Sequence, residues 1–214
     1  MIVSHKHKFI FLKTKKTAGT SLEIALSKLC GPDDIITPIS PEDEQTRKDL
    51  GYRGPQNYQI SKDKFFYNHI GCKQIVGLLG PQVWSDYYTF CFERNPWDKV
   101  ISWYYWEHRQ EPRPSMTEFI DSGHAAMVGG PGGFGLYTAN NKVVVNKVCR
   151  FENLRAELDQ LERDLNLPPI PELPRAKSKF RVDKRPYSEL MTDTDKDKIA
   201  QIFQREIALF GYQF

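Results

Sequence analysis

Long apolar runs are absent from this chain of 214 residues. No stretch approaches the ~18 consecutive apolar residues that a membrane-spanning helix requires. The N-terminal stretch MIVSHKHKFIFLKTKK also lacks the apolar centre and the small-residue cleavage site of a secretory signal peptide. The sequence therefore predicts a cytoplasmic protein with no membrane span.

Cysteine is scarce as well. The four that occur form no CxxC pair and stand far apart, at Cys30, Cys72, Cys91 and Cys149. Zinc sites and redox-active dithiols use closely spaced pairs, and small secreted domains carry a higher density of cysteine. We expect four reduced thiols in the core and no bound metal.

Charge of either sign is in no large excess. Charged residues make up 27% of the chain and the net charge is +3, so the composition does not require nucleic acid as a partner, whereas an anionic small molecule suits it. The hydrophobic fraction of 40% suffices for a core, and the length predicts one domain over residues 1–214.

Runs with strand propensity alternate with helical patterns along the chain. Residues 8–13 predict a buried strand and residues 19–30 a helix, and a second strand over 87–93 precedes a helix over 96–108. Further predictions are a short helix over 71–80, a flexible glycine-rich loop over 129–135, a third strand within 143–151, a helix capped by Asn153, and a final helix over 193–209 that ends at Gly211. This alternation predicts an α/β fold in which helices flank a parallel sheet.

The segment KTKKTAGTS (13–21) joins the first expected strand to the first expected helix. At such a junction, backbone N–H groups and the helix N-terminus converge, which favours the binding of phosphate. Gly19 lets the backbone approach an anion closely, and Lys16 adds a mobile positive charge. The residues predicted to bind the anion are Lys16, Thr17, Ala18, Gly19, Thr20 and Ser21.

The same loop is not a Walker A motif, G-x-x-x-x-G-K-[ST]. Its lysine stands before the glycine instead of after it. The hydroxyl that binds magnesium in a Walker A loop is therefore not specified, which disfavours a metal-dependent kinase or NTPase.

KTAGTS resembles the K-T-[AG]-[GS]-T-S signature of sulfotransferases that use 3′-phosphoadenosine 5′-phosphosulfate (PAPS), in their carbohydrate-type branch. FERNPWDKVISWY (92–104) resembles the 3′-phosphate motif of that family, R-[DN]-P-x-x-x-x-x-S, and RFENL (150–154) resembles its third landmark. The C-terminal FGYQF is similar to the family's tail. Glu93 departs from the pattern, since family members usually carry an apolar residue before the arginine.

This resemblance implies a P-loop-like sulfotransferase fold. It also implies the transfer of a sulfuryl group from PAPS, without a metal, to a hydroxyl or amine acceptor, with a glycan favoured. Arg94 and Ser102 map onto the residues that hold the 3′-phosphate. Lys16 maps onto the residue that stabilises charge on the leaving 3′-phosphoadenosine 5′-phosphate (PAP).

A general base is needed to take the acceptor's proton, and histidine suits this role because its pKa lies near neutrality. Of the five histidines, His69 stands at an expected strand-to-helix turn and falls where related sulfotransferases place the base. His108 and His124 are the next candidates. His5 and His7 are expected to precede the first strand and to be solvated.

Each of these residues also has a plainer structural interpretation. Arg94 can be an ion-pair partner of Glu93 or Asp98, Ser102 an ordinary helix serine, and His69 a helix cap or a core residue.

Other segments leave alternatives open in the same way. The basic segment 175–185 can be a solvated face or a lid over the cofactor, and the loop 129–135 can be an acceptor gate or a surface loop. Glu152 in RFENL is expected to pair with Arg150.

Two other functions remain open at this level. One is a P-loop-type nucleotide kinase or NTPase, and the other is a non-enzymatic nucleotide- or RNA-binding module that uses 175–185. The acceptor cannot be read from the residues: the irregular segments 32–68 and 105–140 are expected to shape its pocket, and a lipid, a small metabolite or a peptide tyrosine are alternatives to a glycan.

Overall fold

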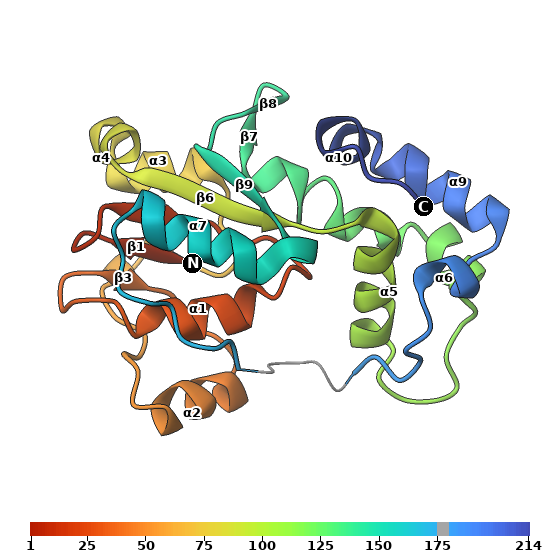
Figure 1. Ribbon diagram of the computed structural model, residues 1–214, viewed down its shortest axis with the longest axis horizontal. Coiled ribbons are helices and arrows are strands. Elements are labelled where there is room, and N and C mark those ends of the chain that lie inside the picture. Colours follow the sequence, from red (N-terminus) through yellow and green to blue (C-terminus); the bar gives the residue numbers. More distant parts are fainter. Residues whose placement is uncertain (175–179) are drawn as a thin grey trace.

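The computed structural model describes residues 1–174 and 180–214. Within them, five strands form the main sheet in the order β3-β1-β2-β6-β9 (Figure 1). β2, β6 and β9 run parallel, whereas β1 is antiparallel to both β2 and β3. These strands are β1 (Ile2–Ser4), β2 (Phe9–Phe11), β3 (Ile35–Ile36), β6 (Tyr88–Glu93) and β9 (Lys147–Arg150).

The prediction of a parallel sheet is therefore wrong for the pairs that β1 forms with β2 and β3. A short turn over residues 5–8 joins β1 to β2, and a connection that short can join only antiparallel neighbours. His5 and His7 lie in this turn and not ahead of the first strand. His5 is part-buried, and its Nδ1 lies 2.8 Å from the Tyr87 hydroxyl.

Helices cover both faces of the sheet, so the α/β class is confirmed. Their bounds are α1 (Gly19–Ser27), α2 (Pro41–Asp49), α3 (Cys72–Leu79), α4 (Pro81–Asp86), α5 (Pro96–Glu107), α6 (Met116–Asp121), α7 (Leu154–Asp164), α8 (Tyr187–Leu190), α9 (Asp193–Ile202) and α10 (Gln204–Phe210). Short elements lie between them: β4 (Gln59–Ser61), β5 (Lys64–Phe65), β7 (Thr138–Ala139), β8 (Lys142–Val143), η1 (His124–Val128), η2 (Phe134–Leu136) and η3 (Phe151–Asn153).

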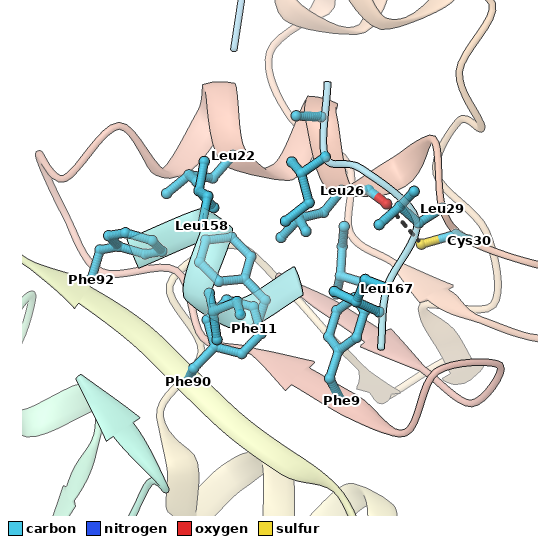
Figure 2. Packing of buried hydrophobic residues seen from close by; sticks show 14 of the residues in the cluster. Phe9, Phe11, Leu22, Leu26, Leu29, Cys30, Phe90, Phe92, Leu158 and Leu167 are labelled. Carbon is cyan, nitrogen blue, oxygen red and sulfur yellow. Dashed lines mark hydrogen bonds between the residues drawn. The ribbon is translucent and has the colours of Figure 1, made fainter. Parts of the chain in front are cut away.

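Alternate side chains of β2 enter two different layers of the core, as the twofold period of a strand requires. Phe9 and Phe11 pack with Leu22 of α1 on the face that α1 and α7 cover (Figure 2). Ile10 belongs to the cluster on the opposite face, together with Ile75 of α3. A further cluster joins residues of α5, α6 and α9. These helices lie beyond the end of β6 (Figure 1).

Two helix predictions differ from the structure. The final helix is two helices, because Phe203 between α9 and α10 has φ −107° and ψ 22°. Gly211 ends α10 in the left-handed region (φ 63°), as expected. Asn153 precedes α7 but, within the described residues, its side chain makes no capping hydrogen bond.

The four cysteines all lie in the described part of the chain, where they are buried and unpaired as expected. In residues 1–174 and 180–214, no helix is both long enough and apolar enough to cross a membrane.

A buried carboxylate connects several of these elements. Glu23 on α1 is fully buried and lies 2.9 Å from the Met1 α-ammonium and 2.7 Å from the Lys13 ammonium. The Thr37 hydroxyl donates to the same carboxylate at 2.7 Å, and an Arg47 guanidinium nitrogen lies 3.9 Å away. Burial opposes ionisation of Glu23, but the Met1 and Lys13 cations outweigh it and lower its pKa to about 2.

Glu23→Gln should lower the free energy of unfolding by about 3–5 kcal/mol at pH 7, because the buried Lys13 ammonium loses its counter-charge. Urea unfolding followed by circular dichroism measures this loss. Since the folded-state pKa of about 2 lies below the ordinary value of 4.5, the advantage of the wild type should shrink as the pH falls from 4.5 toward 2.

The matched control is Asp197→Asn, which removes an exposed carboxylate from α9. It should change the free energy of unfolding by less than about 0.5 kcal/mol. An equal loss in the two variants would contradict a structural role for Glu23.

Candidate active site

A cavity of about 610 Å³ opens at the carboxyl ends of β2 and β6. It is lined by residues of the loop 13–21, called the phosphate loop below after the ligand that its sequence predicts, by residues of α1 and α5, by His69, by residues of η3 and the start of α7, and by residues that follow α7. Six cationic side chains line it, and no carboxylate does so among the described residues; the cations are Lys13, Lys15, Lys16, Arg94, Arg181 and Lys184. Such a lining favours a ligand that carries several negative charges.

The phosphate loop has the backbone geometry of an anion-binding turn. Lys16 and Ala18 both adopt the left-handed region, with φ of 63° and 59°, and α1 begins at Gly19. Left-handed residues in a turn bring successive N–H groups to one side, where they meet the positive end of the helix. Of the predicted loop residues, Lys16, Ala18, Gly19, Thr20 and Ser21 line the cavity.

Thr17 is the exception. Its side chain is 1% exposed, and its hydroxyl lies 2.8 Å from the Thr14 hydroxyl. The Thr14 hydroxyl in turn donates to the Phe92 carbonyl at 2.5 Å. Thr17 therefore connects the loop, by way of Thr14, to Phe92 of β6, and it is not among the residues that line the cavity, although it is predicted to bind the anion.

Gly19 is required by packing more than by the approach of an anion. A Cβ at this position would lie 2.7 Å from Lys13 Cγ and 3.3 Å from the Thr14 carbonyl oxygen. The stem of Lys13 cannot easily withdraw, because its ammonium is bonded to Glu23 and to Asn68.

Arg94 follows β6 directly and has two sets of contacts. Its guanidinium donates to Asp98 at 2.5 Å and 2.9 Å and to the Lys16 carbonyl at 3.2 Å, and it lies 4.3 Å from the centre of the Phe151 ring. The ion-pair interpretation with Asp98 is thus confirmed. Arg94 also lines the cavity, so its contact with Asp98 does not remove it from the site.

Helix α5 starts next to Arg94 because Asn95 caps it. The Asn95 side chain accepts a hydrogen bond from the Trp97 N–H at 3.1 Å, and Pro96 occupies the first turn. This start brings Ser102 to the cavity wall on the second turn of the helix.

Two tryptophans of α5 line the cavity and were missed by the sequence analysis. Trp103 and Trp106 stack with their ring centres 4.9 Å apart. The Lys15 ammonium lies 5.3 Å from the Trp103 ring and the Lys16 ammonium 5.4 Å from the Trp106 ring. The spacing of three residues after the RNP turn was the available signal, since such residues share one face of a helix.

The described part of the basic segment reaches the cavity too. Phe180, Arg181 and Lys184 line it, and Arg181 forms an ion pair with Asp98 at 2.6 Å. Asp98 therefore holds Arg94 and Arg181 together. Residues 175–179 of the expected lid or solvated face lie outside the described residues.

His69 lines the cavity at the turn that leads to α3. It is not the helix cap, which is Gly71. Its Nδ1 lies 2.8 Å from the Lys13 carbonyl oxygen. Burial, and then the charge of Lys13, lower the pKa of His69 to about 4, so the ring is neutral at pH 7. His108 and His124 are not among the residues that line the cavity.

Glu93, the residue that departs from the sulfotransferase-like pattern, does not line the cavity. It is fully buried and pairs with the Lys99 ammonium, which is fully buried as well. The Tyr137 hydroxyl donates to its second oxygen at 3.1 Å, and the Arg94 N–H donates to its first oxygen at 3.0 Å. A carboxylate can occupy this buried position because the Lys99 ammonium of α5 neutralises it.

Two further predictions are corrected. Glu152 accepts a hydrogen bond from the Asn95 N–H at 2.5 Å, whereas Arg150 donates to the Phe210 carbonyl, so these two residues do not pair. The glycine-rich loop 129–135 is packed: the Lys15 N–H donates to the Gly132 carbonyl at 2.9 Å, and a Cβ on Gly132 would lie 2.3 Å from the Met127 carbonyl oxygen. The loop supports the phosphate loop from behind.

No group of three or more His, Cys, Asp or Glu side chains is placed to hold a metal ion among residues 1–174 and 180–214. A reaction without a metal stays a prediction.

Comparison with known proteins relates this chain to an archaeal protein. No family model matches the chain. It is 32% identical over 101 residues to an uncharacterized protein of Archaeoglobus fulgidus, and this match covers 44% of the chain and 80% of the archaeal protein. The chain belongs to the same family as that archaeal protein. The relative's description names no activity, so functional inference depends on the cavity.

Gly19→Ala should lower the free energy of unfolding by about 1–3 kcal/mol, because the added methyl group overlaps the anchored stem of Lys13. Gly77→Ala is the matched control, since Gly77 lies within α3 and a Cβ there meets open space. The control should be neutral or stabilising by up to about 1 kcal/mol. Equal effects in urea unfolding would refute the packing explanation for Gly19.

Proposed function

We propose that this protein is a sulfotransferase that moves a sulfuryl group from PAPS to a hydroxyl or amine acceptor, on a P-loop-like sulfotransferase fold. One observation carries the proposal. Three segments contribute to the same cationic cavity. The loop of Lys16 and the turn of Arg94 resemble sulfotransferase motifs, and the turn of His69 falls where related sulfotransferases place the base.

The charges of the cavity suit PAPS. This molecule carries a 3′-phosphate and a phosphosulfate, two separate anionic groups joined by an adenosine. The phosphate loop and the N-terminus of α1 suit one group, and Arg94 with Ser102 suits the other. The aromatic rings of Trp103, Trp106 and Phe151 offer apolar surface for the part between them.

The transfer step assigns a role to each residue. His69 accepts the proton of the acceptor hydroxyl while the acceptor oxygen forms its bond to sulfur. The bond between sulfur and the bridging oxygen breaks, and PAP leaves with that electron pair. Lys16 neutralises the charge that develops on the bridging oxygen. The negative charge of a bound PAPS raises the pKa of His69 from about 4 and so increases its strength as a base.

The acceptor proposed is a glycan hydroxyl, on the basis of the carbohydrate-type loop sequence. A lipid, a small metabolite or a peptide tyrosine are the alternatives that an acceptor panel with labelled sulfate separates.

The four buried free thiols support the proposed cytoplasmic location.

The alternatives to a sulfotransferase are a nucleotide kinase or NTPase and an RNA-binding module. A kinase needs magnesium for its nucleotide, and Lys16 stands before the loop glycine where a Walker A lysine stands after it. If the protein is an RNA-binding module, its binding of RNA should weaken steeply with salt and should not compete with PAP.

PAP should raise the melting temperature of the protein by several degrees in the absence of magnesium, because a ligand at 100 times its Kd stabilises the folded state by about 2.7 kcal/mol. A thermal-shift titration with PAP and with ATP, each with and without magnesium, measures the effect. Stabilisation by ATP with magnesium but not by PAP would overturn the sulfotransferase proposal in favour of a kinase or NTPase.

Lys16→Ala and Arg94→Ala should separate chemistry from binding. Lys16→Ala should lower kcat by about 10²–10³-fold, since one preorganised charge is lost at the reacting bond. Arg94→Ala should weaken PAP binding more than it lowers kcat, because the 3′-phosphate is remote from the transferred group and its contacts contribute to ground state and transition state alike. Ser102→Ala should show the same pattern as Arg94→Ala, more mildly.

Transfer assays and calorimetric titration with PAP at one fixed salt concentration measure both quantities, since salt screens phosphate contacts. Lys142→Ala, which removes an exposed lysine of β8, is the control and should leave both unchanged. Normal turnover in Lys16→Ala, or unchanged PAP affinity in Arg94→Ala, would reject the corresponding assignment.

A further inference from the structure

We infer that Lys13 is a positioning residue for His69: it holds the histidine ring with the Nε2 lone pair available to an acceptor. This inference rests on the proposed function, because it deepens the role of His69 as the general base. Lys13 stands two residues after β2, and 4% of its side chain is exposed.

Lys13 contacts two consecutive residues of the histidine turn with two different groups. Its ammonium donates to the Asn68 side-chain oxygen at 3.0 Å, and its carbonyl oxygen lies 2.8 Å from His69 Nδ1. The same ammonium donates to Glu23 at 2.7 Å, so the lysine is itself held from α1. One residue at the end of β2 thus fixes a turn that lies more than fifty positions further along the chain.

The turn needs such support because its backbone is strained. His69 has φ 59°, a left-handed conformation that is unfavourable for a residue with a Cβ. Asn68 donates its side-chain amide to the Pro38 carbonyl at 2.6 Å while it accepts from Lys13. The Asn68 side chain therefore anchors the turn on two sides, and Lys13 is one of them.

The contact with the carbonyl decides which nitrogen of the ring can act as a base. A carbonyl oxygen only accepts, so His69 Nδ1 must carry the proton and donate it to Lys13. In the neutral ring the other nitrogen, Nε2, then holds the free lone pair. A ring rotated away from the Lys13 carbonyl would lose this selection of tautomer.

Charge acts in the same place. The pKa of His69 is lowered to about 4 by burial first and by the Lys13 ammonium second. The Met1 α-ammonium and Lys15 lower it further, whereas the hydrogen bond to the Lys13 carbonyl raises it. Lys13 therefore keeps the ring neutral well below pH 7 as well as holding its orientation.

A purely structural Lys13 would serve only as the counter-charge of Glu23. That role predicts a loss of stability in Lys13 variants and no effect on the histidine. The two roles are separated by measuring His69 directly, with long-range proton–nitrogen NMR correlations of its ring, which report tautomer and pKa without any substrate.

The experiment compares Lys13→Met with Lys15→Met. The control removes a charge from the same loop, but the ammonium of Lys15 lies over the Trp103 ring and not beside Asn68. The wild type should show the Nδ1–H tautomer of His69. Lys13→Met should raise the pKa of His69 by about one pH unit or more, and Lys15→Met should raise this pKa less. If Lys13→Met fails to fold, Lys13→Met combined with Glu23→Gln removes one buried charge of each sign and serves in its place.

Transfer kinetics supply the second measurement. Asn68→Ala should lower kcat by about tenfold while PAP affinity stays within about twofold, because the variant disturbs the base and not the phosphate loop. In a His69→Ala background the same change should have no further effect on kcat, since a positioning residue acts only through the group it positions.

The outcomes distinguish the inference from the proposed function. A wild-type His69 that carries its proton on Nε2 instead of Nδ1, an unchanged pKa of His69 in Lys13→Met, or an Asn68→Ala effect that persists without His69 would overturn the positioning role. A wild type that neither binds PAP nor transfers sulfate would overturn the proposed function, and the NMR comparison would still decide whether Lys13 orients His69.

Discussion

The carboxylate of Glu23 is the constraint on which the site depends. A carboxylate that is fully buried is too costly to leave unpaired, so the elements that bring its partners must assemble around it. Those partners are Met1 just before β1, Lys13 shortly after β2, Thr37 just after β3, and Arg47 on α2. Because α1 carries Glu23 and also begins at the phosphate loop, satisfying the carboxylate sets the position of the loop.

A second buried pair positions the start of α5. Glu93 at the end of β6 and Lys99 on α5 are both fully buried and neutralise each other, which fixes the first turns of α5 beside Arg94. The phosphate loop and the RNP turn therefore each depend on a buried carboxylate that does not line the cavity. This arrangement leaves the cavity lining cationic while the acids that balance it lie behind the wall.

Asp98 contacts two of the lining cations, and its position affects how strongly the cavity can bind an anion. It contacts both Arg94 and Arg181, which joins the RNP turn to the segment that follows the undescribed residues 175–179. An anion in the cavity competes with Asp98 for these two guanidinium groups. Both arginines already have a partner in Asp98. The free energy of anion binding therefore reflects the exchange of Asp98 for the anion, and not the formation of a wholly new ion pair.

Local chemistry along the chain was enough to predict the strand, loop and helix around residues 13–27, the RNP turn with its helix, and the α/β class. These features depend on periodicity, capping and glycine or proline within a few residues of each other. The left-handed Lys16 and Ala18, the direction of β1, and the roles of Lys13, Trp106 and Arg181 needed three-dimensional packing. Their contacts join residues as far apart as Asp98 and Arg181, and no pattern along the chain records which distant partners a buried charge will meet.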